Sequence, residues 1–131
     1  MSRYLHTSIF VNDMAESIAF YEKLGLRLLD GPLHYPGNCD MAFVGADWNA
    51  YIELVYDLEE HPPYDAGNRF EHLAVAVDGD FGEFVERLAS SGMNLLRGPK
   101  KSPGGSRWIA FVMDPNGVEV ELLEERTGKV T

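Results

Sequence analysis

The sequence is poor in several kinds of residue, and each shortage excludes a class of protein. The only cysteine, Cys39, leaves no partner for an intramolecular disulfide. Lysine and arginine number 11 against 21 acidic residues, so the chain lacks the basic face that nucleic acid or an anionic membrane surface would require. The first residues contain no apolar run long enough for a signal peptide or a membrane span. A cytoplasmic location is therefore expected.

Apolar residues, by contrast, are plentiful enough for one hydrophobic core. They make up 45% of the 131 residues, which is the size of an ordinary single domain. We expect one domain over residues 1–131, built from a first module at about 4–57 and a second at about 70–125. The proline-rich and glutamate-rich stretch at 58–69 is predicted to link them.

The two modules are predicted to be copies of one unit. The apolar run at 6–11 resembles the run at 72–77, and each is typical of a strand. Asn12 or Asp13 is expected to cap the helix that follows in the first copy. Apolar residues recur at helical spacing after both strands: Met14, Ile18, Tyr21 and Leu24, and then Phe81, Phe84, Val85 and Leu88.

Three more strands are predicted to complete each copy. They are expected at 26–29, 40–44 and 51–56 in the first copy and at 94–97, 108–113 and 118–123 in the second. The segment Asp114-Pro115-Asn116-Gly117 is a hairpin turn signal between the last two strands. The order is therefore βαβββ twice, an α+β fold.

Each copy places a histidine at its first strand and a glutamate inside its last. The pairs are His6 with Glu53 and His72 with Glu121, at almost equal spacings. Each glutamate stands between two apolar residues, so strand alternation points its carboxylate away from the face that those neighbours bury. A carboxylate inside an apolar strand is costly unless it is paired or bound to a metal.

Taken singly, a strand histidine or glutamate is more often an ordinary hydrogen-bonded or solvent-facing side chain. Four of them at matching positions of a repeat indicate a metal site instead. Its nitrogen and oxygen donors suit a divalent ion such as Ni(II), Co(II), Fe(II) or Zn(II). The other histidines, His34 and His61, fall in proline-rich loops and are interpreted as surface residues, with His34 the one that could reach the cleft mouth.

Over most of its length, about residues 4–125, the sequence resembles glyoxalase I (lactoylglutathione lyase) of the vicinal-oxygen-chelate superfamily. The most specific part of the resemblance is the His/Glu/His/Glu ligand set. The segments that carry it are residues 5–7, 17–21, 24–26, 41–45, 51–54, 72–77, 109–117 and 119–122.

The resemblance implies a curled mixed sheet with a metal-binding cleft. It also implies a homodimer, in which His6 and Glu53 meet His72 and Glu121 of the partner subunit. One divalent ion is expected per site, Ni2+ or Co2+ by preference and Zn2+ as an alternative. The substrate would be the hemithioacetal of methylglyoxal and glutathione, converted through an enediolate to S-lactoylglutathione. Glu121 is the first choice for the base that moves the proton, and Glu53 is its counterpart.

Phe10 departs from the family pattern, which has an arginine there that holds a carboxylate of glutathione. An aromatic ring cannot form that bidentate pair. One interpretation is that Phe10 packs in the core while Arg69, or Lys101 in a loop at 98–105, takes over the carboxylate. The other is that the substrate is a different thioester or α-oxo compound, acted on by an isomerase or epimerase of the superfamily. A metal-free small-molecule-binding resistance protein is the third hypothesis, which a metal analysis would separate from the other two.

Overall fold

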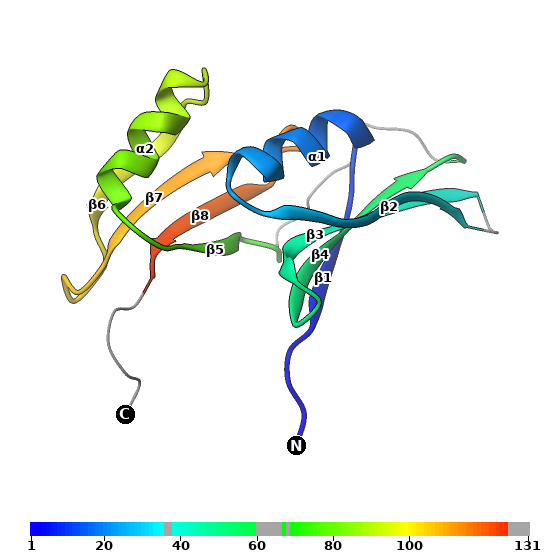
Figure 1. The fold of residues 1–131 in the computed structure, drawn as a ribbon, viewed down its shortest axis with the longest axis horizontal. Coiled ribbons are helices and arrows are strands. Elements are labelled where there is room, and N and C mark those ends of the chain that lie inside the picture. The colour runs from blue at the N-terminus through cyan, green and yellow to red at the C-terminus, as the bar shows by residue number, and fades with distance from the viewer. Residues whose placement is uncertain (36–37, 60–66, 68, 126–131) are drawn as a thin grey trace. The chain divides into compact units, whose positions relative to one another are not determined.

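The computed structural model describes residues 1–35, 38–59, 67 and 69–125. The chain divides into two compact units, Met1–Ala66 and Gly67–Thr131. Both units have the predicted βαβββ order, which Figure 1 shows along the chain. The elements are β1 (His6–Phe10), α1 (Met14–Lys23), β2 (Arg27–Tyr35), β3 (Cys39–Asp47), β4 (Ala50–Asp57), β5 (Leu73–Val77), α2 (Phe81–Ser90), β6 (Leu95–Lys101), β7 (Trp108–Met113) and β8 (Glu119–Glu124).

The first unit is a four-stranded sheet in the order β1-β4-β3-β2 that carries α1. β1 runs parallel to β4, and the other two pairings are antiparallel. Of the two candidate caps, Asp13 is the one that begins α1, because its side chain accepts a hydrogen bond from the backbone N–H of Glu16 at 2.9 Å. The fully buried core includes Tyr21 from the helix and Leu54 from β4.

The second unit repeats this plan with the order β5-β8-β7-β6 and with α2. β5 runs parallel to β8, while β7 is antiparallel to both of its neighbours. The helix buries the side chains of Phe81, Phe84 and Leu88. On the adjoining strands the residues that alternate into the interior are fully buried, among them Val120 and Leu122 on β8. Both units are therefore built on one pattern, with the glutamates of β4 and β8 on the face away from their buried apolar neighbours and with consecutive residues buried on the central strands β3 and β7.

The predicted hairpin turn at 114–117 joins β7 to β8. Asp114 is only 3% exposed, and its carboxylate accepts hydrogen bonds from the backbone N–H groups of Asn116 and Val118 at 2.8 and 2.7 Å. Gly117 has a φ of 85°, a conformation that glycine adopts without a steric penalty. The predicted turn is thus confirmed, and it is stabilised by the hydrogen bonds of Asp114 and by the positive φ of Gly117.

The strand after each helix is longer than the sequence predicts. β2 continues to Tyr35 and β6 to Lys101, and both contain a Gly-Pro pair with a cis peptide bond, at Gly31-Pro32 and Gly98-Pro99. A Cβ atom at Gly31 would stand 2.5 Å from the carbonyl oxygen of Met41, and one at Gly98 would stand 2.7 Å from that of Ile109. The shift in register at each pair interrupts the regular alternation, which is why short strands were expected.

Two loop assignments from the sequence are corrected by these longer strands. His34 lies in β2 rather than in a loop, with its ring hydrogen-bonded to Asp40 on β3 at 2.9 Å and its side chain 63% exposed. Lys101 is the last residue of β6 rather than part of a loop. His61 and most of the expected linker lie outside the described residues.

Within the part of the chain that the structure describes, no helix combines the length and the apolar character that a membrane span needs.

Candidate metal centre

The first unit brings together His6 and Glu53, the two ligands predicted for it. His6 lies opposite Tyr51 on the parallel strand, and Glu53 lies opposite Ser8, two residues further along both strands. The separation between His6 Nε2 and Glu53 Oε2 is 3.3 Å. The side chains are 32% and 18% exposed, so the pair is open to a ligand on the sheet face opposite the core.

The second unit brings together His72 and Glu121 in the same way. His72 comes directly before β5, and Glu121 pairs with Ala74, again two residues further along. The distance from His72 Nε2 to Glu121 Oε1 is 3.4 Å, and the side chains are 28% and 17% exposed. The two pairs, which we call half-site 1 and half-site 2, therefore agree in register, distance and exposure.

The separation of the donor atoms fits two ligands on one ion. Metal–nitrogen and metal–oxygen bonds of about 2.1 Å place neighbouring ligand atoms about 3.0 Å apart at a right angle and about 3.4 Å apart at a tetrahedral angle. The distances of 3.3 and 3.4 Å lie in that range and beyond the usual length of an N–H···O hydrogen bond. In each half-site both donors also stay partly accessible, as an ion would require.

Among the residues described, no group of three or more potential metal ligands occurs. The four predicted ligands are brought together two by two, one nitrogen and one oxygen donor in each unit. Two protein donors alone leave most of the coordination shell of a divalent ion open.

The two histidines differ in what surrounds them. The His6 ring stacks on Tyr51, with centroids 4.9 Å apart and planes 24° from parallel, and its Nδ1 is buried without a hydrogen-bond partner. The His72 ring meets the edge of Phe111 and its Nδ1 lies 3.0 Å from a carboxylate oxygen of Glu71. The ligands repeat across the two units, but their supports do not.

Arg97 was not predicted from the sequence, and the structure places it on the half-site 2 face. Arg97 pairs with Phe111, which in turn pairs with Glu121 across the antiparallel strands. Its guanidinium carbon lies 4.2 Å from the centroid of the Phe111 ring, and it forms an ion pair with Glu119. The register shifts on both sides of Arg97 hide its orientation from simple alternation. The strand pairing thus places Arg97 on the same sheet face as Phe111 and Glu121.

The three residues predicted to bind substrate have different surroundings. Phe10 is 52% exposed, so it does not belong to the buried core of its unit, and that interpretation is wrong. Arg69 is exposed and lies before β5. Lys101 places its ammonium group 4.6 Å from the centroid of the Trp108 ring. Either cation is accessible to an anionic group.

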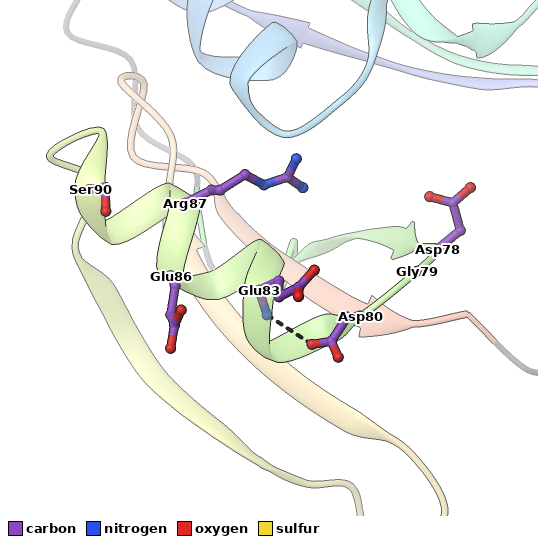
Figure 2. A pocket seen from close by; sticks show the side chains of 7 residues that line it. All are labelled: Asp78, Gly79, Asp80, Glu83, Glu86, Arg87 and Ser90. Atoms are coloured by element: carbon purple, nitrogen blue, oxygen red, sulfur yellow. Dashed lines mark hydrogen bonds between the residues drawn. The ribbon is translucent and has the colours of Figure 1, made fainter.

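The second unit also contains an open hollow of about 530 Å³ beside α2 (Figure 2). Four of its residues are acidic, and one of these, Asp80, accepts the hydrogen bond from the backbone N–H of Glu83 that caps the helix. None of the predicted ligands lines it. These acidic side chains cap the N-terminus of α2 or lie in solvent near it, where negative charge is favourable, so the hollow needs no ligand to explain them.

Comparison with known proteins assigns the family. Residues 3–122 match the Glyoxalase/Bleomycin resistance protein/Dioxygenase superfamily. The lactoylglutathione lyase of Salmonella typhimurium is 40% identical over 95% of this chain and 93% of its own length. That of Escherichia coli O157:H7 is 38% identical over the same shares. The chain belongs to the glyoxalase I family.

Solved glyoxalase structures agree with this assignment. The glyoxalase I of Zea mays matches with a TM-score of 0.82 and 31% identity over 94% of this chain, and this chain spans only 44% of the maize chain. The trypanothione-dependent glyoxalase I of Leishmania major matches with a TM-score of 0.78 and 30% identity over 97% of this chain and 89% of its own. The predicted family and the predicted fold class are both confirmed.

Proposed function

We propose that this glyoxalase family member is a metal-dependent lyase that converts the hemithioacetal of methylglyoxal and glutathione to S-lactoylglutathione. One observation carries the proposal: two His–Glu pairs in matching register, with donor atoms 3.3 and 3.4 Å apart. Lactoylglutathione lyases with up to 40% identity over nearly the whole chain support the same reaction. A cytoplasmic location belongs to the proposal.

His6, Glu53, His72 and Glu121 would hold one divalent ion between a half-site 1 and a half-site 2. The donors are two imidazoles and two carboxylates, a set that suits Ni2+ or Co2+ and also accepts Zn2+. When bound, the ion supplies the positive charge that stabilises an enediolate. All four side chains are partly exposed, as access of a substrate to the bound ion would require.

One of the glutamates would move the proton. The isomerisation takes a proton from the carbon that carries the sulfur and returns one to the neighbouring carbon, which a carboxylate can do in both directions. We assign this role to Glu121, with Glu53 as its counterpart for the other substrate enantiomer. The two are 17% and 18% exposed and their histidine distances agree within 0.1 Å, so their surroundings, rather than their own geometry, must separate the roles.

The two half-sites of one metal centre are proposed to come from the two chains of a homodimer. A mixing experiment tests this directly. One inactive variant carries His6→Ala with Glu53→Ala, and the other carries His72→Ala with Glu121→Ala. A mixed dimer would regain one complete site out of two only if each site draws on both chains. No recovery of activity after subunit exchange would place all four ligands on a single chain instead.

A carboxylate on the substrate needs a cation near the half-sites. Arg69 and Lys101 are the candidates that the sequence offers, and Arg97 is the one that the fold adds. The Arg97 guanidinium already pairs with Glu119, so a substrate carboxylate would have to share or replace that partner. Substituting each of the three with glutamine and comparing KM tests which one binds, because a lost anchor raises KM more than it lowers kcat.

The decisive experiment for the reaction is a hemithioacetal assay with Ni2+, Co2+, Mn2+ and Zn2+ added in turn to the metal-free protein. Turnover followed by the absorbance of the thioester is the expected result. Absence of turnover with all four metals, in protein shown to bind one of them, would contradict the reaction. Absence of metal binding as well would favour a metal-free binding protein.

Phe10 supports a second candidate, in which the thiol is not glutathione. Phe10 shares a face of β1 with His6, because the two residues are four positions apart, and its side chain is half exposed. It stands where the family's arginine would meet a carboxylate. The Leishmania major relative is trypanothione-dependent, which makes a thiol other than glutathione a candidate for this chain as well. Repeating the assay with other thiols separates the candidates: a kcat/KM higher with another thiol than with glutathione favours this second one.

A further inference from the structure

The two proposed histidine ligands have the same position in the repeat but unlike neighbours. Leu5 precedes His6, whereas Glu71 precedes His72. Tyr51 comes two residues before the glutamate of half-site 1, and Glu119 holds the corresponding place in half-site 2. These substitutions between the copies change the groups that can touch each imidazole ring.

Glu71 supports His72 through a hydrogen bond. Its carboxylate oxygen lies 3.0 Å from Nδ1, while Nε2 faces Glu121. A carboxylate that accepts from one ring nitrogen fixes which nitrogen is free for a metal and which way the ring turns. With Leu5 at the same place, His6 has no such acceptor, and its Nδ1 is buried without a partner.

Tyr51 supports His6 through ring stacking instead. The two centroids are 4.9 Å apart at 24° between planes. The tyrosine ring is itself held edge-on by Trp48 at 5.1 Å and by Phe43 at 6.0 Å. This aromatic group limits the rotation of the imidazole that a hydrogen bond limits in half-site 2.

We infer that Glu71 is the positioning residue of His72 and that Tyr51 is the positioning residue of His6. The two halves of one metal centre are thus oriented by different physical means, one polar and one aromatic. The inference rests on the proposed function, since it assumes that both imidazoles bind a metal through Nε2. It adds two residues that the four ligands do not include.

For half-site 2 the test is Co2+ binding by calorimetry to the full-length protein and its variants. Glu71→Ala should weaken binding by about 10-fold. Glu71→Gln should keep most of the affinity, because its amide oxygen still accepts from Nδ1. Glu86→Ala, which removes an exposed carboxylate from α2, is the charge-matched control and should leave the affinity unchanged.

For half-site 1 the same titration compares Tyr51→Phe, which retains the stacking ring, with Tyr51→Ala, which removes it. The phenylalanine variant should bind like the parent, and the alanine variant should lose about 3-fold to 10-fold in affinity. An equal loss in both variants would overturn the role of Tyr51, because the hydroxyl and not the ring would then matter.

A spectroscopic readout separates positioning from a general loss of structure. In the Co2+-loaded protein, the exchangeable Nδ1 proton of His72 should give a shifted resonance that Glu71→Gln retains and Glu71→Ala loses to solvent exchange. If the parent protein binds one Co2+ per site and Glu71→Ala binds it equally tightly, the positioning role of Glu71 is overturned while the proposed function stands. Failure of the parent protein to bind any of the four metals would overturn the proposed function and this inference with it.

Discussion

The two units share their strand order and their His–Glu pair, the proposed metal ligands, but differ in most of the side chains around that pair. Half-site 1 lies among aromatic rings, with Tyr51, Phe43 and Trp48 in mutual contact. Half-site 2 lies among charged groups, with Glu71 on the imidazole and Arg97 paired to Glu119. The strand register thus brings each histidine and glutamate together in both units, while the neighbour that contacts the imidazole differs, Tyr51 in one unit and Glu71 in the other.

The parallel pairing of the first and last strands explains what the two units share. In both units the glutamate lies two residues beyond the position opposite the histidine, so the register places the two side chains close together on one face. A phenylalanine stands opposite each glutamate on the next strand, Phe43 and Phe111, and both are at least nine-tenths buried. The residues that differ between the two copies are therefore the candidates for substrate binding and for orienting the proposed ligands.

The largest expected effect comes from removing the charge of the two glutamates one at a time. Glu121→Gln should lower kcat by about 100-fold to 1,000-fold with Ni2+, since general base catalysis contributes about that much. Glu53→Gln, the matched variant of the other half, should retain more activity on the same substrate enantiomer. Steady-state kinetics with both variants checks this. A larger loss in Glu53→Gln would reverse the roles that we assign.

A second prediction treats the two halves as equals, because the close approach of strands at the Gly-Pro pairs is the same in both. Gly31→Ala and Gly98→Ala should each lower the free energy of unfolding by about 3 kcal/mol, since the new Cβ atom meets a backbone carbonyl and the backbone has positive φ.

Urea denaturation provides the measurement for the glycine variants. Gly82→Ala on α2 is the control: its Cβ would lie 3.3 Å from one side-chain atom, the capping oxygen of Asp80, and would meet no backbone atom. Alanine also favours a helix over glycine, so the variant should stay within about 0.5 kcal/mol of the parent protein. If only one of the two strand variants is destabilised, the close strand packing at the Gly-Pro pair is not shared by both units, although the His–Glu pair is.

The smallest effect is expected at the turns that close the two hairpins. Asp114→Ala should cost about 1 to 3 kcal/mol, because it leaves buried backbone N–H groups without their acceptor. Asp47→Ala should cost less than about 0.5 kcal/mol, since Asp47 is exposed and accepts one hydrogen bond, from the backbone of Asn49. Thermal unfolding of the two variants compares them, and equal losses would show that burial does not decide the value of these turns.

Much of the fold could be predicted because each element depends on local rules. The two helices, the order βαβββ and the turn at Asp114 all follow from spacing and turn chemistry, as do the two candidate caps of α1, Asn12 and Asp13. The lengths of β2 and β6 could not be predicted, because register shifts at Gly31 and Gly98 interrupt the alternation that marks a strand.

The candidate site divides in a similar way. The pairing of His6 with Glu53 and of His72 with Glu121 follows from a repeat that the sequence displays openly. Tyr51, Glu71 and Arg97 escape sequence reasoning because their relevance depends on where a ring or a carboxylate turns in space. The sequence repeat predicts the His–Glu pair that the two half-sites share, but it does not predict the residues around each pair, which differ.

The most direct test of the central claim is the metal content of the protein and of two double variants, measured after equilibration with Ni2+ and gel filtration. We expect one ion per chain in the parent protein. We expect almost none in His6→Ala with Glu53→Ala, and almost none in His72→Ala with Glu121→Ala, because each variant removes one half of every centre. Two ions per chain in the parent, or a full ion retained in either variant, would contradict the claim that the two half-sites share one metal.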